Sequence, residues 1–379
     1  AALAAYQKDF EIAETLAREA PDNPSLQLDL SIAWNNLGDV KEAQGDAAGA
    51  LAAFESGLAI VERLTMQEPG NSTYQLDLAA SWSRIGDVRR AQRNLPAALE
   101  AYEKSMAITE HLAASEPDNT TWQRGFAVAI ERVGDARLRG GNYDGALQAY
   151  GRELEVARHV AELDRGNAEW QRGLLLALHK LGDVKWYQQD YAGALAAYVE
   201  ASGIAERLAE ADPTSLTALR DLATSWTDIG DTKRSQGDLA GAVEAYRKAL
   251  QIRNRLAEQD PQSAQRHRDL ATVWRILGDL RQAQGDLAAT LDAFRMALAE
   301  DEQVLKLDPS FADARHNLIS DLGRIGVVSF AMGDRAGAET ALTRAKTLAD
   351  QALADHPDDK QAQADKAWID AQVVKIGSQ

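Results

Sequence analysis

Apolar residues recur along the chain at the spacing of an α-helix, three to four positions apart. One stretch has this face at Leu26, Leu30, Ala33, Trp34 and Leu37, and the next has it at Ala50, Leu51, Phe54 and Leu58. No segment alternates with a period of two, so strands are not expected. The pattern predicts pairs of helices of about 20 residues, each roughly 30 Å long.

This pair of helical stretches returns every 48 residues. The phrase Trp34-Asn35-Asn36-Leu37-Gly38-Asp39 sets the register, and its glycine recurs at Gly86, Gly134, Gly182, Gly230, Gly278 and Gly326. The prolines keep the same interval, at Pro21, Pro69, Pro117, Pro213, Pro261, Pro309 and Pro357, and only Arg165 replaces one. A fixed period of this size predicts a repeat array in which each repeat touches its neighbours.

Two kinds of break separate the helical stretches. Acidic, proline and small polar residues end one helix and cap the next, as in Glu68-Pro69-Gly70-Asn71. Midway between the prolines, a glycine can adopt the left-handed conformation that ends a helix, at Gly45, Gly141, Gly237, Gly285 and Gly333. Arg93-Asn94 and Gln189-Asp190 lack this glycine, and Asn94 is the candidate to take its place.

The glycine of the repeated phrase is predicted to lie inside the first helix of each pair. A loop at Gly38 would leave only residues 39–44 before the next break, too few for a helix. A glycine inside a helix costs up to about 1 kcal/mol relative to alanine, so we expect close approach by the partner helix in compensation. The second helix has a small-residue column for this contact, at Ala50, Ala98, Ala146, Ala194, Ala242, Thr290 and Ala338. Four residues later it has an aromatic column, at Phe54, Tyr102, Tyr150, Tyr198, Tyr246 and Phe294.

These columns resemble the tetratricopeptide repeat family, whose motif runs Trp, Leu-Gly, Gly-Asp/Asn-Tyr, Ala, Tyr/Phe, Pro. The segments 141–150 and 237–246 match it almost residue for residue. The usual unit is 34 residues, so the longer period here implies longer helices. The resemblance implies an all-α fold, a right-handed α-solenoid (superhelix) of stacked antiparallel helix hairpins.

The whole chain, residues 1–379, is predicted to form a single solenoid. Residues 1–20 align with a second helix alone and residues 357–379 with a first helix alone. Seven full repeats lie between them, at 21–68, 69–116, 117–164, 165–212, 213–260, 261–308 and 309–356. Because such an array rarely begins with a bare packing face, we expect the chain to be part of a longer protein.

The net charge of −17 narrows the classes of partner. Nucleic-acid binding needs a basic face, and anionic membranes repel an acidic surface, so neither is expected as a partner. There is no cysteine, and no apolar run approaches the roughly 20 residues that span a bilayer. No signal peptide is recognised, and the expected location is the cytoplasm.

No set of residues predicts catalysis. The sequence has no phosphate-binding glycine loop followed by Lys-Ser/Thr, and no serine lies in a nucleophile elbow. Of the six histidines, only His111 and His159 share a repeat position, on second helices where a solvated surface is the simpler interpretation. We therefore expect no enzyme activity, no cofactor and no metal site.

Binding is the better-supported expectation. The family resemblance implies that first helices line a concave groove, at positions equivalent in the first full repeat to Ile32, Asn35, Asn36, Asp39, Glu42 and Ala43. An aspartate column would run along this groove, at Asp39, Asp87, Asp135, Asp183, Asp231 and Asp279. A partly basic column lies beside it, at Arg84, Arg132, Lys180 and Arg324. The alternative is that Arg84 and Asp87, three residues apart on one helix, only neutralise each other.

The fourth full repeat breaks the pattern with Trp186-Tyr187, close to His179, Lys180 and Asp183 on the same helix. Aromatic residues are typical binding anchors, although this pair could instead fill space against an adjacent helix. The predicted binding residues are Arg84, Asp87, Arg90, Arg132, Asp135, His179, Lys180, Asp183, Trp186, Tyr187, Asp231 and Arg234. The family's peptide-carboxylate clamp is not expected, because aspartate stands where it requires asparagine.

The sequence thus predicts a protein–protein interaction module that holds a peptide or helical segment in the groove, with a basic or amphipathic segment favoured. In bacteria such arrays often belong to larger regulatory or signalling proteins. One alternative is a structural scaffold or spacer that self-associates end to end. Another is substrate recruitment for an enzyme domain outside this chain.

Overall fold

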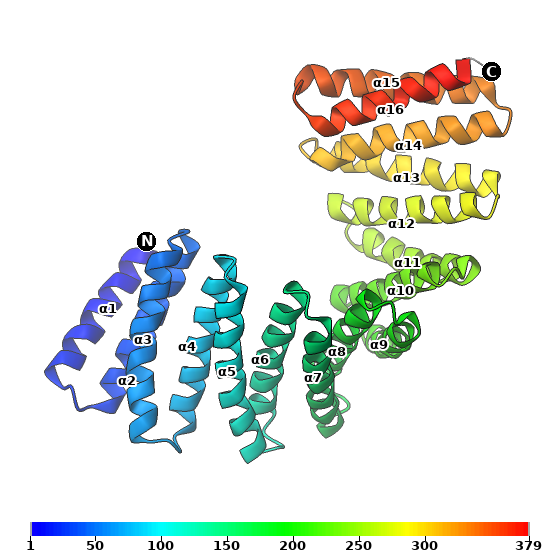
Figure 1. The fold of residues 1–379 in the computed structure, drawn as a ribbon. Coiled ribbons are helices and arrows are strands. Elements are labelled where there is room, and N and C mark those ends of the chain that lie inside the picture. The colour runs from blue at the N-terminus through cyan, green and yellow to red at the C-terminus, as the bar shows by residue number, and fades with distance from the viewer. Residues whose placement is uncertain (1, 378–379) are drawn as a thin grey trace. The chain divides into compact units, whose positions relative to one another are not determined.

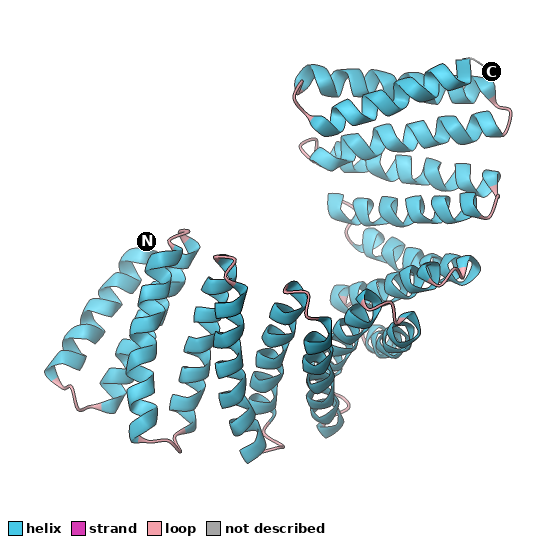
Figure 2. Cartoon of the chain, viewed as in Figure 1, coloured by secondary structure: helices cyan, strands magenta, loops and turns pink. Residues whose placement is uncertain are grey.

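The computed structural model describes residues 2–377, and within them every regular element is an α-helix (Figure 2). The chain divides into two compact units, Ala1–Asp190 (unit 1) and Tyr191–Gln379 (unit 2). Within each unit, helices that follow one another in the sequence pack side by side as hairpins (Figure 1). The predicted all-α fold of stacked helix hairpins is confirmed.

Even-numbered helices correspond to the predicted first helices and odd-numbered ones to the second helices. Unit 1 contains α1 (Ala2–Glu19), α2 (Pro24–Ala43), α3 (Ala47–Gln67), α4 (Ser72–Ala91), α5 (Leu95–Ser115), α6 (Thr120–Arg139), α7 (Tyr143–Leu163) and α8 (Ala168–Tyr187). Unit 2 contains α9 (Tyr191–Ala211), α10 (Leu216–Ser235), α11 (Leu239–Gln259), α12 (Ala264–Ala283), α13 (Leu287–Leu307), α14 (Ala312–Ala331), α15 (Arg335–Asp355) and α16 (Lys360–Gly377). The first helices α2 to α14 have 20 residues each and the second helices α3 to α15 have 21, as the apolar period predicts.

Polar residues cap the helices at the predicted breaks. The Asn23 side chain accepts hydrogen bonds from the backbone N–H groups of Ser25 and Leu26 at the start of α2. Asn71 does the same for α4, and Asn167 for α8. Each cap satisfies N–H groups that have no partner within the helix, which fixes where the first helix of a repeat begins.

The midway breaks use the left-handed conformation. The five predicted glycines have φ between 76° and 84°. Where glycine is missing, Arg93 and Gln189 themselves have φ of 60° and 63°. The expectation for Asn94 is wrong: it has φ of −92°, and its side chain accepts a hydrogen bond from the N–H of Ala97 as the N-cap of α5. The hairpin geometry therefore determines which position has the left-handed conformation. A residue other than glycine adopts this conformation there at a cost in conformational free energy.

The helix-interior glycines lie against the aromatic column, as predicted. A Cβ added to Gly134 would be 2.5 Å from Cε1 of Tyr150, and one added to Gly278 would be 2.5 Å from Cε1 of Phe294. The small-residue column beside it is fully buried, from Ala50 in α3 to Ala338 in α15. In five hairpins, those of Phe54, Tyr102, Tyr150, Tyr246 and Phe294, an aromatic ring packs onto the bare backbone of the partner helix, and in the α14–α15 hairpin Leu342 takes this place against Gly326.

Candidate functional site

The surface formed by α2, α4, α6 and α8, which we call the first-helix face of unit 1, carries ten of the twelve predicted binding residues. Asp231 and Arg234 lie on α10 in unit 2. On α8, Asp183 and Tyr187 are exposed, whereas His179, Lys180 and Trp186 are half-buried.

Three members of the aspartate column accept hydrogen bonds from tyrosines of the second helices. The hydroxyl of Tyr102 donates to Oδ1 of Asp87 at 2.8 Å, and that of Tyr150 donates to Oδ1 of Asp135 at 2.5 Å. Burial, followed by the hydrogen bond to Asp87, raises the pKa of Tyr102 to about 12. In unit 2, Tyr246 donates to Asp231 at 2.6 Å in the same way. These three aspartates therefore satisfy buried phenol groups inside their own hairpins.

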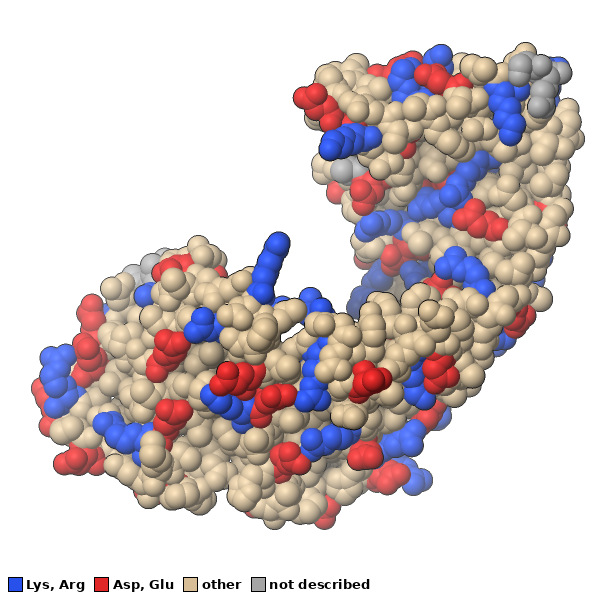
Figure 3. Space-filling view, in the orientation of Figure 1, with Lys and Arg blue, Asp and Glu red and all other residues tan. Residues whose placement is uncertain are grey.

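The three arginines of the basic column each pair with an aspartate of the preceding repeat. Arg84 contacts Asp39 at 3.3 Å, 45 residues earlier, and Arg132 contacts Asp87 at 3.0 Å. Arg324 of unit 2 contacts Asp279 at 2.6 Å at the same offset. The same-helix alternative for Arg84 is wrong, because its partner is Asp39. Acidic and basic side chains accordingly lie interspersed on the visible surface (Figure 3).

Two further predicted arginines also bind the aspartate column. Arg90 donates from Nε to the Tyr102 hydroxyl at 3.3 Å and lies 3.7 Å from Asp87. In unit 2, Arg234 contacts Asp231 at 2.8 Å on the same helix. A ligand would have to displace these partners to reach Asp87 or Asp231.

Tyr187 leaves its ring exposed at the C-terminal end of α8. It is 53 % exposed and stacks on Tyr143 of α7, with ring centroids 6.0 Å apart and planes 18° apart. Trp186 meets Tyr187 edge-on at 5.7 Å. A recess of about 420 Å³ lies beside this stack, lined by Asp135, Leu138, Arg139, Tyr143 and Tyr187. Tyr187 therefore contacts the adjacent helix and still presents an aromatic surface to solvent.

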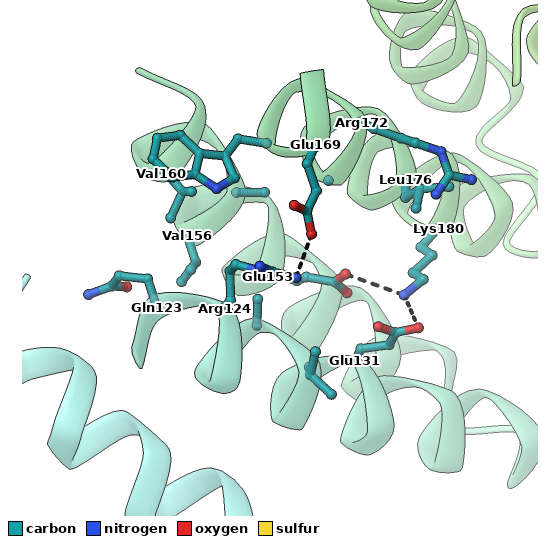
Figure 4. A pocket seen from close by; sticks show the side chains of 15 residues that line it. Gln123, Arg124, Glu131, Glu153, Val156, Val160, Glu169, Arg172, Leu176 and Lys180 are labelled. Atoms are coloured by element: carbon teal, nitrogen blue, oxygen red, sulfur yellow. Dashed lines mark hydrogen bonds and ion pairs between the residues drawn. The ribbon is translucent and has the colours of Figure 1, made fainter. Parts of the chain in front are cut away.

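A second recess lies between α6 and α8 over α7, which the sequence analysis missed (Figure 4). Its volume is about 440 Å³. The apolar part of its lining comes from Ala127, Val128, Val156, Ala157, Val160, Trp170 and Leu176. The polar and charged part comes from Gln123, Arg124, Glu131, Glu153, Glu169, Arg172 and Lys180, and Gly173 completes the lining. We call it the α6–α8 recess.

Three charged side chains meet inside this recess. The Nζ atom of Lys180 lies 2.5 Å from Glu131 and 3.3 Å from Glu153 (Figure 4). Glu153 is only 6 % exposed, and its Oε2 atom has no hydrogen-bond partner. Burial raises the pKa of Glu153 to about 7, and the attraction of Lys180 only partly opposes this shift. Of the predicted residues, Lys180 alone lies in this cluster.

The repeat alignment contained a signal for Glu153. The other repeats have small residues in its column, at Gly57, Ser105, Ala201, Ala249, Ala297 and Ala345. A carboxylate at a buried small-residue position breaks the pattern as sharply as Trp186-Tyr187 does.

The rim of the recess carries an ion pair and includes one glycine. Arg124 of α6 contacts Glu169 of α8 at 2.6 Å across the opening. Gly173 lies inside α8, yet a Cβ added to it would meet no atom within 4 Å. Packing therefore does not require glycine there, unlike at Gly134.

Among residues 2–377, no group of three or more histidine, aspartate or glutamate side chains has an arrangement that could hold a metal ion. None of the helices in this range combines the length and the apolar character that a membrane span requires.

Comparison with known proteins agrees with this architecture. Residues 222–263 match the family model described as tetratricopeptide repeat. The structure of BtubC from P. vanneervenii is similar with a TM-score of 0.50 and 20 % identity, over 69 % of this chain and 92 % of that one. A signal transduction ATPase with numerous domains and a tetratricopeptide repeat sensor, from Pyrococcus horikoshii, is similar with a TM-score of 0.56 and 15 % identity. That match covers 94 % of this chain and 46 % of the ATPase. No curated protein sequence matches the chain. The tetratricopeptide resemblance is confirmed, and the comparisons with solved structures bear on the fold alone.

Proposed function

We propose that unit 1 is a protein-interaction module that binds a segment of a partner protein along α6 and α8. The observation that carries this proposal is a continuous stripe of residues on α6 that lines two recesses. Arg124, Val128, Glu131, Asp135 and Leu138 follow one another on α6 at intervals of three or four residues. Such residues share one helix face, and they line both the α6–α8 recess and the recess beside Tyr187. The stripe is roughly 20 Å long at 1.5 Å per residue.

The chemistry of this surface supports a peptide or helical segment as the ligand. Exposed aromatic and aliphatic side chains, such as Tyr187 and Leu176, are suited to anchor apolar residues of a partner. The net charge of −17 favours a basic or amphipathic segment over an acidic one. The proposal assigns binding and no catalysis to the chain, and it accords with a place in a larger regulatory or signalling protein.

Site-specific photo-crosslinking in cells tests the proposal. A photoreactive phenylalanine analogue at Leu176 or Tyr187 should cross-link to one partner segment, which mass spectrometry then identifies. The matched control carries the same residue at Glu155, which is exposed on α7 and does not line either recess. Equal cross-linking from all three positions would contradict a binding site on α6 and α8.

A substitution completes the test. Tyr187→Ala should weaken the cross-link from Leu176 while helicity and melting temperature stay unchanged, because the Tyr187 ring is largely exposed. Met66→Ala removes another exposed apolar side chain of unit 1, 75 % exposed on α3, and should have no effect. Normal cross-linking in the Tyr187 variant would remove this residue from the proposed site.

End-to-end self-association is the second candidate, favoured by apolar side chains on the two outermost described helices. Ile12 of α1 is 51 % exposed, and Trp368 and Val374 of α16 are 40 % and 70 % exposed. If copies stack through these surfaces, the mass measured by light scattering should rise with concentration. Val374→Asp should abolish the rise, and a constant monomer mass across concentrations would reject this candidate.

A further inference from the structure

We propose that the α6–α8 recess receives an arginine side chain of the partner segment, with Glu153 as the carboxylate that binds its guanidinium group. This inference rests on the proposed function and specifies what one position of the partner segment must carry. Its basis is the combination of a partly apolar recess, a buried carboxylate with an unpartnered oxygen, and a single lysine that serves two carboxylates at the base.

The lining as a whole is balanced in charge, because Arg124, Arg172 and Lys180 match Glu131, Glu153 and Glu169, but the cluster at its base has fewer cations than carboxylates. Lys180 is the only cation of the three-residue cluster, and it serves two carboxylates, Glu131 and Glu153. One negative charge therefore remains when both acids are ionised. Oε2 of Glu153 also lacks a donor, and a buried acceptor without a donor is costly. An incoming cation with N–H donors would neutralise the remaining charge of the cluster and donate a hydrogen bond to Oε2 of Glu153.

The walls of the recess suit the stem of such a cation. Val128 and Leu176 are exposed in the first-helix face, and Val156 and Val160 of α7 lie below them in the lining. The methylene stem of arginine packs on apolar surface while its charged head reaches a polar group. A guanidinium group is planar, binds carboxylates through two N–H groups, and is more weakly hydrated than an ammonium group. These properties favour arginine over lysine in a recess that removes water from the head group.

Gly173 supplies an independent observation. Four other repeats have aspartate in its column, at Asp29, Asp77, Asp221 and Asp269, and the preceding repeat has Gly125, which also meets open space but does not line this recess. Glycine is a poor helix former, and at Gly173 no neighbouring atom demands it. A side chain at this position would project at the opening of the recess, so glycine keeps the opening clear for a ligand.

Nuclear magnetic resonance with small probes tests the inference without the partner protein. The probes are N-acetyl-arginine methylamide and its uncharged isostere N-acetyl-citrulline methylamide, added to the whole chain labelled at valine and leucine methyl groups. The arginine probe should shift the methyl resonances of Val156, Val160 and Leu176 saturably, at millimolar concentrations. The citrulline probe should bind at least tenfold more weakly. Equal shifts with the two probes, or arginine-induced shifts confined to methyl groups outside the recess, would overturn the inference.

Variants assign the effect to Glu153. Glu153→Ala restores the alanine of Ala201 and Ala249, so it should fold, and it should weaken arginine binding at least tenfold. Glu155→Ala removes an exposed acid two residues away on the same helix and should change binding less than twofold. Gly173→Leu should close the opening and abolish the shifts while melting is retained. A Glu153→Ala variant that binds within twofold of the wild type would also overturn the inference.

The dependence on pH provides another readout. Binding should strengthen from pH 6 to pH 8, because the guanidinium group requires the ionised form of Glu153. The charged groups that act on Glu153 are Glu131 and Asp135 from α6 and Lys180 from α8. Arginine binding that is independent of pH over this range would contradict a role for Glu153.

The two proposals can fail separately. If Leu176 cross-links to a partner but the arginine probe shifts nothing, the protein-interaction proposal stands and the arginine inference falls. If the arginine probe binds but neither Leu176 nor Tyr187 cross-links to a partner, the recess recognises the cation and the partner-segment proposal falls.

Discussion

The α6–α8 region of unit 1 and the α12–α14 region of unit 2 each place acidic residues where other repeats have small ones. Glu153 stands in a column of glycine, serine and alanine, and Asp321 stands in a column of small residues that includes Ala129 and Ala177. In unit 2, Arg275 contacts both Asp301, at 2.5 Å, and Asp321, at 3.2 Å. Burial raises the pKa of Asp321 to about 7, as it does for Glu153. By composition and pKa, the two clusters are alike.

They differ in access. The side chains of Asp301 and Asp321 are 1 % and 0 % exposed, so this cluster is sealed within its helices. The cluster of unit 1 lines a recess, and Glu131 remains 39 % exposed there. A break in the repeat pattern therefore does not by itself indicate a ligand. The combination of a pattern break with an accessible recess does, and the following experiments separate the two cases.

The largest effect should come from removing the cation of the sealed cluster. Arg275→Ala leaves two buried aspartates without their partner and should lower the free energy of unfolding by about 3–5 kcal/mol. Urea unfolding measures this loss. Arg295→Ala removes an exposed arginine of α13 and should cost less than about 0.5 kcal/mol. A loss below about 1 kcal/mol for Arg275→Ala would mean that water reaches the cluster.

The pH dependence of stability should identify the acid of the open cluster. Burial gives Glu153 a pKa of about 7 in the folded state, above its ordinary value of 4.5, so the folded state holds its proton more tightly. Its contribution to stability is therefore full below pH 4.5 and is lost as the pH rises through about 7. Glu153→Gln does not titrate, so its stability relative to the wild type should increase between pH 4.5 and pH 8, by at most about 3 kcal/mol. Parallel stability profiles for the two proteins would place Glu153 in contact with bulk water.

Two glycine substitutions should have opposite signs. Gly278→Ala in α12 would bring its Cβ to 2.5 Å from Phe294 and should cost about 1–3 kcal/mol despite the better helix propensity of alanine. Gly173→Ala in α8 meets open space and should stabilise the protein by up to about 1 kcal/mol. Thermal unfolding compares the two variants directly. If Gly173→Ala also destabilises, the recess is narrower than the structure indicates.

The smallest effects belong to exposed ion pairs. The side chains of Arg124–Glu169, at the rim of the recess, and of Arg324–Asp279, in unit 2, are all at least about one-third exposed. Double-mutant cycles should give coupling energies of about 0.2–1 kcal/mol for each pair, and high salt should reduce them. A markedly larger coupling for Arg124–Glu169 would show that the rim excludes water.

The sequence allowed most of the fold to be predicted, because each local signal agreed with the 48-residue period. Helix faces, caps and the glycine–aromatic contact all follow from residue types at fixed positions, as with Gly134 and Tyr150. The left-handed conformation of Arg93 could not be predicted in this way, because the geometry of the hairpin overrides the preference of arginine for negative φ. In such arrays, local chemistry determines the hairpin, and the hairpin then imposes its conformation on exceptional residues.

The candidate site was less accessible to prediction. The pairing of Arg84 with Asp39 depends on how far one hairpin is displaced from the next, which no single repeat encodes. The recess depends likewise on the separation of α6 and α8. Glu153 was visible as an exception within its column, but only the structure shows that this carboxylate lines an opening.

The arginines of the basic column lie 45 residues after the aspartates with which they pair, so a whole repeat can be removed without loss of the ion pair at the junction. Deleting residues 69–116, one whole repeat, would bring Arg132 into the place of Arg84, opposite Asp39. The new junction would regain its ion pair without any further substitution. A deletion one residue longer or shorter would rotate the following helix by about 100° and turn its apolar face away from the core. Recombination between repeats is thus tolerated in steps of a whole repeat, and the number of hairpins can vary while each junction keeps the same chemistry.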